Sequence, residues 1–79
     1  MEPERSFGDA LREVRRQRGL SQEALALEAG IERNYVSLLE LGKNSASVRV
    51  LFKLCAVLGL SPSAFLGLVE RRIKAAQEQ

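Results

Sequence analysis

The chain has 79 residues, 46% of them hydrophobic and 28% charged, which is typical of one small globular domain and too short for two. Its formal net charge of +2 is too weak to indicate a nucleic-acid partner by itself. A single cysteine, Cys55, excludes an internal disulfide and is expected to be a buried thiol in a reducing cytoplasm. The longest apolar run, 54–60, is far shorter than a bilayer span, so no membrane partner is expected.

The first segment with helical periodicity is expected over about residues 7–18. Ser6 followed by Asp9 resembles a capping box, which predicts that the helix starts at Ser6. Gly19 is suited to end it. Apolar residues recur at i, i+4 and i+7 along one face: Phe7, Leu11 and Val14.

Two short helices are expected next. Ser21 is suited to cap the first of them, and Gly30 to end it. The second is expected from Glu32 to Leu41, with Gly42 terminating it. Small or apolar residues occupy the positions where the two helices would cross: Leu25, Ala26, Ala29, Ile31, Val36 and Leu39.

Two longer helices follow a polar loop over 43–46. Ser47 is placed to cap the first, which carries an apolar stripe at helical spacing and ends at Gly59. Ser61 followed by Pro62 is a preferred start for the second, expected to run to about residue 76.

No alternating strand pattern or hairpin turn interrupts these segments, so we predict an all-α fold of five helices. The whole chain, 1–79, is expected to form one domain, with its core over about 7–66. Residues 67–76 would then extend the last helix beyond the core.

The stretch from Ser21 to Glu40 reads SQEALALEAGIERNYVSLLE, two short helices joined by a tight turn at Gly30. This is typical of a helix-turn-helix, whose second helix can enter a major groove. With the continuation LELGK and the later LFKLCAVLGLSP, residues 7–66 resemble the Xre family of helix-turn-helix proteins, which includes lambda repressor and Cro. The chain also resembles the controller proteins of restriction–modification systems. The resemblance implies a lambda-repressor-like fold and a regulator of transcription that binds double-stranded DNA.

The resemblance places the exposed face of the helix 32–41 against base pairs. Arginine can bond guanine and asparagine can bond adenine in the major groove. Glu32 either accepts a hydrogen bond from cytosine or only favours the helix N-terminus, and Leu38 either touches a thymine methyl or packs at the edge of the core. The residues expected to contact bases are Arg33, Asn34, Ser37, Glu32 and Leu38.

A second set of polar residues is expected to contact phosphates. Gln22 begins a helix, where anions are favoured, although it could instead serve only as a helix cap. Tyr35 either reaches a phosphate through its hydroxyl or only packs, and Arg16 and Arg18 are weaker candidates. Relatives often carry Asn-Pro where this chain has Ser45-Ala46, so the loop conformation is left open. The expected phosphate contacts are Ser21, Gln22, Tyr35, Lys43, Asn44 and Ser45.

The resemblance also implies a structural ion pair between Arg15 and Glu40, partly buried, which would fix the recognition helix against the first helix. Glu40 would then have no catalytic role.

A single recognition helix reads few base pairs, so a homodimer on a pseudo-palindromic operator is expected. Phe52 lies off the core stripe, and apolar residues continue along the last helix. Phe65 could equally close the core of one chain. The residues expected at the dimer interface are Phe52, Phe65, Val69 and Ile73.

No second domain to sense a ligand is expected, so we expect the regulation to depend on the concentration of the protein itself, including feedback on its own promoter. No small-molecule ligand is expected. An antitoxin-like module that binds another protein is the alternative. Enzymatic activity, cofactors and metal sites are not expected, because the chain lacks histidine, clustered acids and a glycine-rich phosphate loop.

Overall fold

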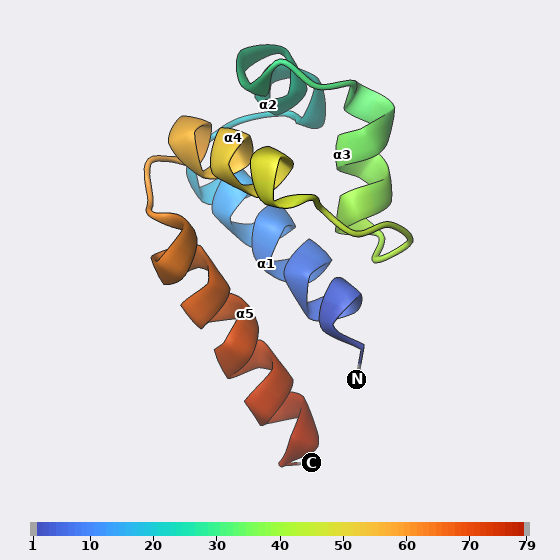
Figure 1. Cartoon of the computed structure of the whole chain (residues 1–79), viewed down its shortest axis with the longest axis vertical. Helices are drawn as coiled ribbons and strands as arrows, with labels where there is room; N and C mark the ends of the chain where they lie inside the picture. The colour runs from blue at the N-terminus through green and yellow to red at the C-terminus, as the bar shows by residue number, and fades with distance from the viewer. Residues whose placement is uncertain (1, 79) are drawn as a thin grey trace.

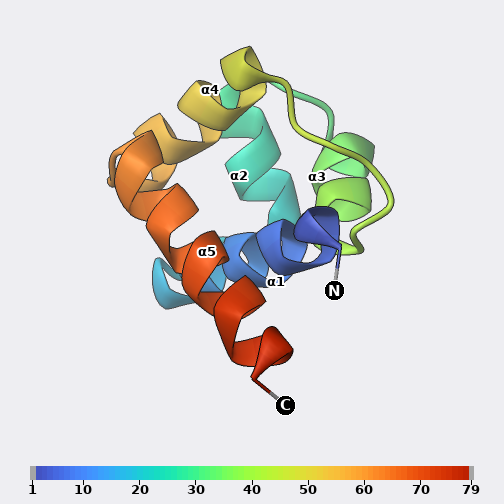
Figure 2. The same ribbon diagram turned by 60° about the horizontal axis from the view of Figure 1, so that its bottom comes forward.

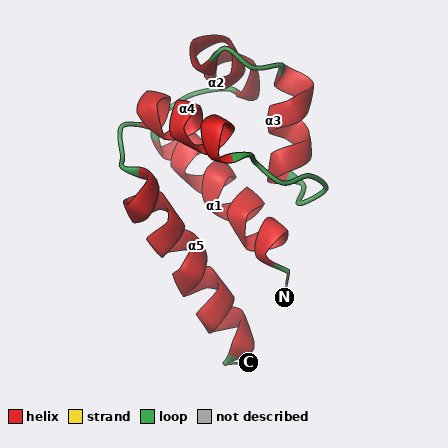
Figure 3. Ribbon diagram, viewed as in Figure 1, coloured by secondary structure: helices red, strands yellow, loops and turns green. Residues whose placement is uncertain are grey.

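A computed structural model describes residues 2–78, and within this range the chain folds into helices joined by short loops, with no strand (Figure 3). The predicted all-α, five-helix fold is therefore confirmed. The helices are α1 (Pro3–Gln17), α2 (Gln22–Ala29), α3 (Arg33–Glu40), α4 (Val48–Leu58) and α5 (Pro62–Gln77).

Three helices begin at the serines that the sequence indicated. The hydroxyls of Ser21, Ser47 and Ser61 accept hydrogen bonds from backbone N–H groups three residues later, at 3.0, 3.2 and 3.1 Å. Each bond satisfies one of the N–H groups that a helix start leaves without an intrahelical partner. At the other ends, Gly30 and Gly59 adopt left-handed φ angles of 71° and 77°, which favour glycine. The predicted boundaries of α2 and α4 and the predicted start of α5 are confirmed.

The predicted start of the first helix is wrong. α1 begins at Pro3, and Glu2 occupies the N-cap position without a capping side-chain bond. Proline suits the first helical position because its φ is already helical and its missing N–H would have no partner there. Ser6 consequently lies inside the helix and is fully buried. α3 also differs slightly, since Glu32 is its N-cap and Glu40 its last residue.

The helix α1 crosses the middle of the molecule, with α3 against one side of it and α5 against the other (Figure 1). The helix α2 packs on α3 and α4, closing the far end of the bundle (Figure 2). The core is mainly aliphatic, and the Phe7 and Phe65 rings meet in it edge to face, with centroids 5.1 Å apart. Cys55 is buried, as predicted.

The helix α1 comes very close to the end of α3 where the two cross. Gly8 is buried there, and a Cβ atom at this position would overlap the carbonyl oxygen of Leu39 and lie 2.7 Å from that of Glu40. Glycine is therefore the only residue that allows α1 and α3 to lie this close. Nothing in the local amino-acid pattern indicates this role for Gly8.

Within residues 2–78, no single helix has the length and apolar character needed to cross a membrane; only α4 and α5 taken together, with a bend of 100° between them, reach that composition.

Candidate nucleic-acid interface

The turn between α2 and α3 presents α3 at the outside of the molecule (Figure 1). Gly30 turns the chain in a left-handed conformation, and the Ile31 N–H donates to the Ala26 carbonyl at 3.0 Å. Val36 and Leu39 anchor the inner face of α3 in the core. The opposite edge is polar and open to solvent: Glu32, Arg33 and Asn34 are exposed, and Ser37 and Leu38 are partly exposed.

The predicted ion pair between Arg15 and Glu40 is present and nearly fully buried, with each residue 8% exposed. Arg15 Nε donates to Glu40 Oε2 at 2.6 Å, and Nη2 donates to Oε1 at 3.0 Å, a two-pronged geometry that fixes both side chains. The hydrogen bond to Glu40 raises the pKa of Arg15 above its ordinary value, against the opposing effect of burial. The pair holds the end of α3 against α1. Separating the two helices here would leave a charge buried without its partner, which costs free energy.

The N-terminus of α2 lies beside this ion pair. The Ser21 hydroxyl caps the helix, and the Gln22 Nε2 group donates to Glu40 Oε1 at 3.1 Å. Gln22 was predicted as a phosphate contact or a cap. Its bond to Glu40 is a third role that the sequence did not indicate, because the two residues are 18 positions apart.

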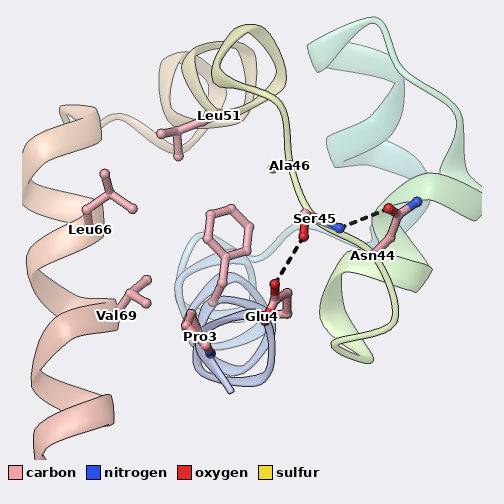
Figure 4. Close-up of a pocket in the computed structure, with 9 residues that line it drawn as sticks. Pro3, Glu4, Asn44, Ser45, Ala46, Leu51, Leu66 and Val69 are labelled. Atoms are coloured by element: carbon pink, nitrogen blue, oxygen red, sulfur yellow. Dashed lines mark hydrogen bonds between the residues drawn. The ribbon is translucent and has the colours of Figure 1, made fainter. Parts of the chain in front are cut away.

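Three hydrogen bonds meet at Ser45 in the loop from α3 to α4. The Tyr35 hydroxyl donates to the Ser45 carbonyl at 3.0 Å, and the Ser45 N–H donates to Asn44 Oδ1 at 2.9 Å. The Ser45 hydroxyl donates to Glu4 Oε2 at 3.3 Å, so the first turn of α1 also contacts the loop (Figure 4). Glu4 was missed in the sequence, since nothing local signals a partner 41 positions away.

Among the weaker phosphate candidates, Arg18 has an internal partner. Its Nε donates to the Leu58 carbonyl at 2.8 Å, which satisfies an acceptor at the end of α4. Arg18 therefore has a structural partner at the end of α4. The residue is exposed, and its contact with a phosphate stays a prediction. Arg16 remains exposed.

Two of the residues predicted at the dimer interface lie in the core instead; for Phe65 this was the stated alternative, and for Val69 it is a correction. Phe65 is 1% exposed and Val69 6% exposed, so both already lie in the core of a single chain and offer almost no surface to a second copy. Phe52 is exposed and Ile73 is partly buried. Val48, four residues before Phe52 and so on the same face of α4, is also exposed and was not predicted.

The α5 helix is further held to α1 by an ion pair between Arg72 and Glu13, near the surface. In the described part of the chain, no three histidine, cysteine, aspartate or glutamate side chains are grouped so that they could hold a metal ion.

The helix-turn-helix family HTH_3 matches residues 11–65, which contain all of α2, α3 and α4. The chain therefore belongs to this family, whose members include helix-turn-helix transcriptional regulators.

Particular members resemble it over most of its length. The control protein C.MunI of a Mycoplasma species is 35% identical over 66 residues, covering 82% of this chain and 89% of that protein. The crystal structure of the restriction–modification controller protein C.AhdI from Aeromonas hydrophila has a TM-score of 0.76 and 39% identity, covering 78% of this chain and 94% of that one. The clp gene regulator ClgR from Corynebacterium glutamicum has a TM-score of 0.89 and 30% identity, covering 99% and 85%.

Proposed function

We propose that this protein is a sequence-specific regulator of transcription that inserts α3 into the major groove of double-stranded DNA. The observation that carries the proposal is the polar outer edge of α3 on a rigid support. Arg33 and Asn34 are exposed and have no hydrogen bond or ion pair inside residues 2–78. Their donors are therefore available for a ligand, while Val36 and Leu39 fix the helix beneath them.

The chemistry of this edge suits base pairs. Arg33 can donate two bonds to guanine O6 and N7, and Asn34 can pair with adenine N6 and N7. Ser37, one turn further along α3, extends the edge. Glu32 and Leu38 flank it and are secondary candidates for cytosine and thymine contacts.

Phosphates on either side of the groove would be held by two groups of residues. The N-terminus of α2, with Ser21 and Gln22, supplies amides and a carboxamide where negative charge is favoured. Lys43 supplies a charge from the loop after α3. Asn44 and Ser45 follow Lys43 in the same loop and complete this group.

The role of Tyr35 differs from a direct contact. Its hydroxyl hydrogen is engaged by the Ser45 carbonyl, so we assign Tyr35 the task of holding the loop against α3. Its oxygen cannot donate to a phosphate without releasing that bond.

A homodimer would place two α3 helices about 34 Å apart, one turn of DNA, and so read a pseudo-palindromic operator. The exposed apolar face of α4 formed by Val48 and Phe52 supports this proposal, together with Ile73 on α5. Exposed apolar residues that share one face of a helix, as Val48 and Phe52 do, are typical of sites that bind another protein.

The similarity to C.MunI and C.AhdI supports a controller-type regulator. We further propose that it acts on its own promoter. A mobility-shift experiment tests this part: the protein should retard a fragment from upstream of its own gene more strongly than a fragment of equal length from elsewhere. Equal retardation of both fragments would refute autoregulation and leave DNA binding standing.

Selection of binding sites from random duplexes tests the recognition edge. Arg33→Ala and Asn34→Ala should each relax preference at particular bases, at a cost of about 1–3 kcal/mol. Arg12→Ala, which also removes an exposed arginine but from α1, is the matched control and should leave base preference unchanged. If both α3 variants keep the original preference, the assignment of the recognition edge is wrong.

A further inference from the structure

One guanidinium group in α1 contacts both ends of the helix-turn-helix. Arg15 Nη1 donates to the carbonyl of Leu20, just before α2 begins, at 2.8 Å. The other nitrogens of Arg15 hold Glu40, the last residue of α3. The entry into α2 and the end of α3 are therefore attached to the same rigid, planar group.

Glu40, which Arg15 holds in place, also bonds the Gln22 side chain at the start of α2. A carboxylate only accepts hydrogen bonds, so the bond between Glu40 Oε1 and Gln22 requires that the Gln22 side chain turns its nitrogen, not its oxygen, towards Glu40. The amide nitrogen has two hydrogens, and this bond uses one. The second remains for a ligand at the partly exposed start of α2.

The orientation matters because the two ends of a carboxamide act oppositely on an anion. Its nitrogen attracts a phosphate and its oxygen repels one. A free glutamine side chain samples both orientations and loses rotational freedom on binding, whereas a side chain that is already held loses less.

We infer that Glu40, itself held by Arg15, is a positioning residue that orients the Gln22 carboxamide for a DNA phosphate. The inference rests on the proposed function and deepens it, because it joins the ion pair of the core to the DNA-facing surface. The test is a double-mutant cycle, because the effects of substitutions on binding free energy do not add when the substituted residues are coupled.

The cycle combines Gln22→Ala with the paired replacement of Arg15→Met and Glu40→Leu. The paired replacement removes both charges together and avoids leaving one buried alone. Gln17→Ala is the matched control, an exposed glutamine at the end of α1 beside Arg72. The readout is the Kd for a fluorescent duplex of random sequence, because a phosphate contact does not depend on sequence.

In the native background, Gln22→Ala should raise Kd about two- to tenfold, the size of one hydrogen bond. Gln17→Ala should leave Kd unchanged. In the background of the paired replacement, adding Gln22→Ala should raise Kd no further. The inference is overturned if Gln22→Ala raises Kd equally in both backgrounds, or if it does not raise Kd in the native background. The proposed function is tested separately, by the effect of Arg33→Ala on base preference.

A second measurement needs no variant. In the native chain without DNA, one of the two side-chain amide hydrogens of Gln22 should exchange with water more slowly than the other by NMR, and the faster one should shift when the duplex is added. Equal, fast exchange of both hydrogens overturns the inference even if the paired replacement fails to fold.

Discussion

A single methyl group added at Gly8 should disturb the packing that supports α3. In Gly8→Ala the new Cβ would overlap the Leu39 carbonyl oxygen and lie 2.7 Å from the Glu40 carbonyl oxygen. Ordinary van der Waals contact begins near 3.4 Å, so the end of α3 has to withdraw by at least about 0.7 Å, the difference between these distances. Both obstacles are backbone atoms, so no side-chain rotation relieves the clash.

Two opposing effects set the size of the change in stability. Overpacking costs about 1–3 kcal/mol, and alanine in place of glycine inside a helix gains about 1 kcal/mol. The withdrawal also pulls Glu40 away from Arg15, which adds to the cost. We therefore expect Gly8→Ala to lower the free energy of unfolding by about 1–2 kcal/mol.

Gly67 in α5 provides the control, because a Cβ atom there would meet nothing within 4 Å. Gly67→Ala should raise the free energy of unfolding by up to about 1 kcal/mol through helix propensity alone. Urea unfolding followed by circular dichroism measures both variants, with equal m-values required for the comparison. If Gly8→Ala is stabilised as much as Gly67→Ala, α1 and α3 do not approach as described and the reasoning fails.

Three further changes test other parts of the structure. Ser47→Ala removes the cap of α4 and should cost about 1 kcal/mol in the same unfolding assay, whereas an unchanged value would show that the cap bond contributes nothing. Burial raises the pKa of the Cys55 thiol above its ordinary value of 9.0, so the thiol stays protonated in the fold when it ionises in the unfolded chain. The stabilisation by the buried thiol is therefore full below pH 9.0 and is lost above it. At alkaline pH, the free energy of unfolding of Cys55→Ala should fall less steeply with pH than that of the native chain. Parallel falls in the two proteins would contradict this. Tyr35→Phe removes the bond to Ser45 and should weaken binding to any duplex without altering base preference, an expectation that an unchanged Kd would rule out.

Much of the secondary structure was predictable because its signals are local. The caps at Ser21, Ser47 and Ser61 bind N–H groups only three residues away, so residue type and position suffice to locate them. The start of α1 was mispredicted although Pro3 carried an equally local signal. The capping-box pattern at Ser6 favours a later start, but the packing of α1 buries Ser6 inside the helix.

The ion pair between Arg15 and Glu40 was expected from the resemblance to a family, since its members are 25 positions apart and nothing local joins them. The bond of the third partner, Gln22, to Glu40 depends on how α1, α2 and α3 pack against one another, so the sequence did not predict it. The same holds for Glu4, whose contact with Ser45 links the start of α1 to the loop after α3.

Most helix ends, the polar face of α3 and the family of the chain were predictable from the amino-acid sequence alone, because they depend on neighbours in the chain or on short motifs. The exposure of individual apolar residues, the need for glycine at position 8 and the orientation of Gln22 all depend on how the helices pack in the folded chain. Phe65 and Phe52 are both aromatic residues on helices, yet one is buried in the core and the other exposed. That difference depends on how the helices cross, which is set by contacts between residues distant in the chain.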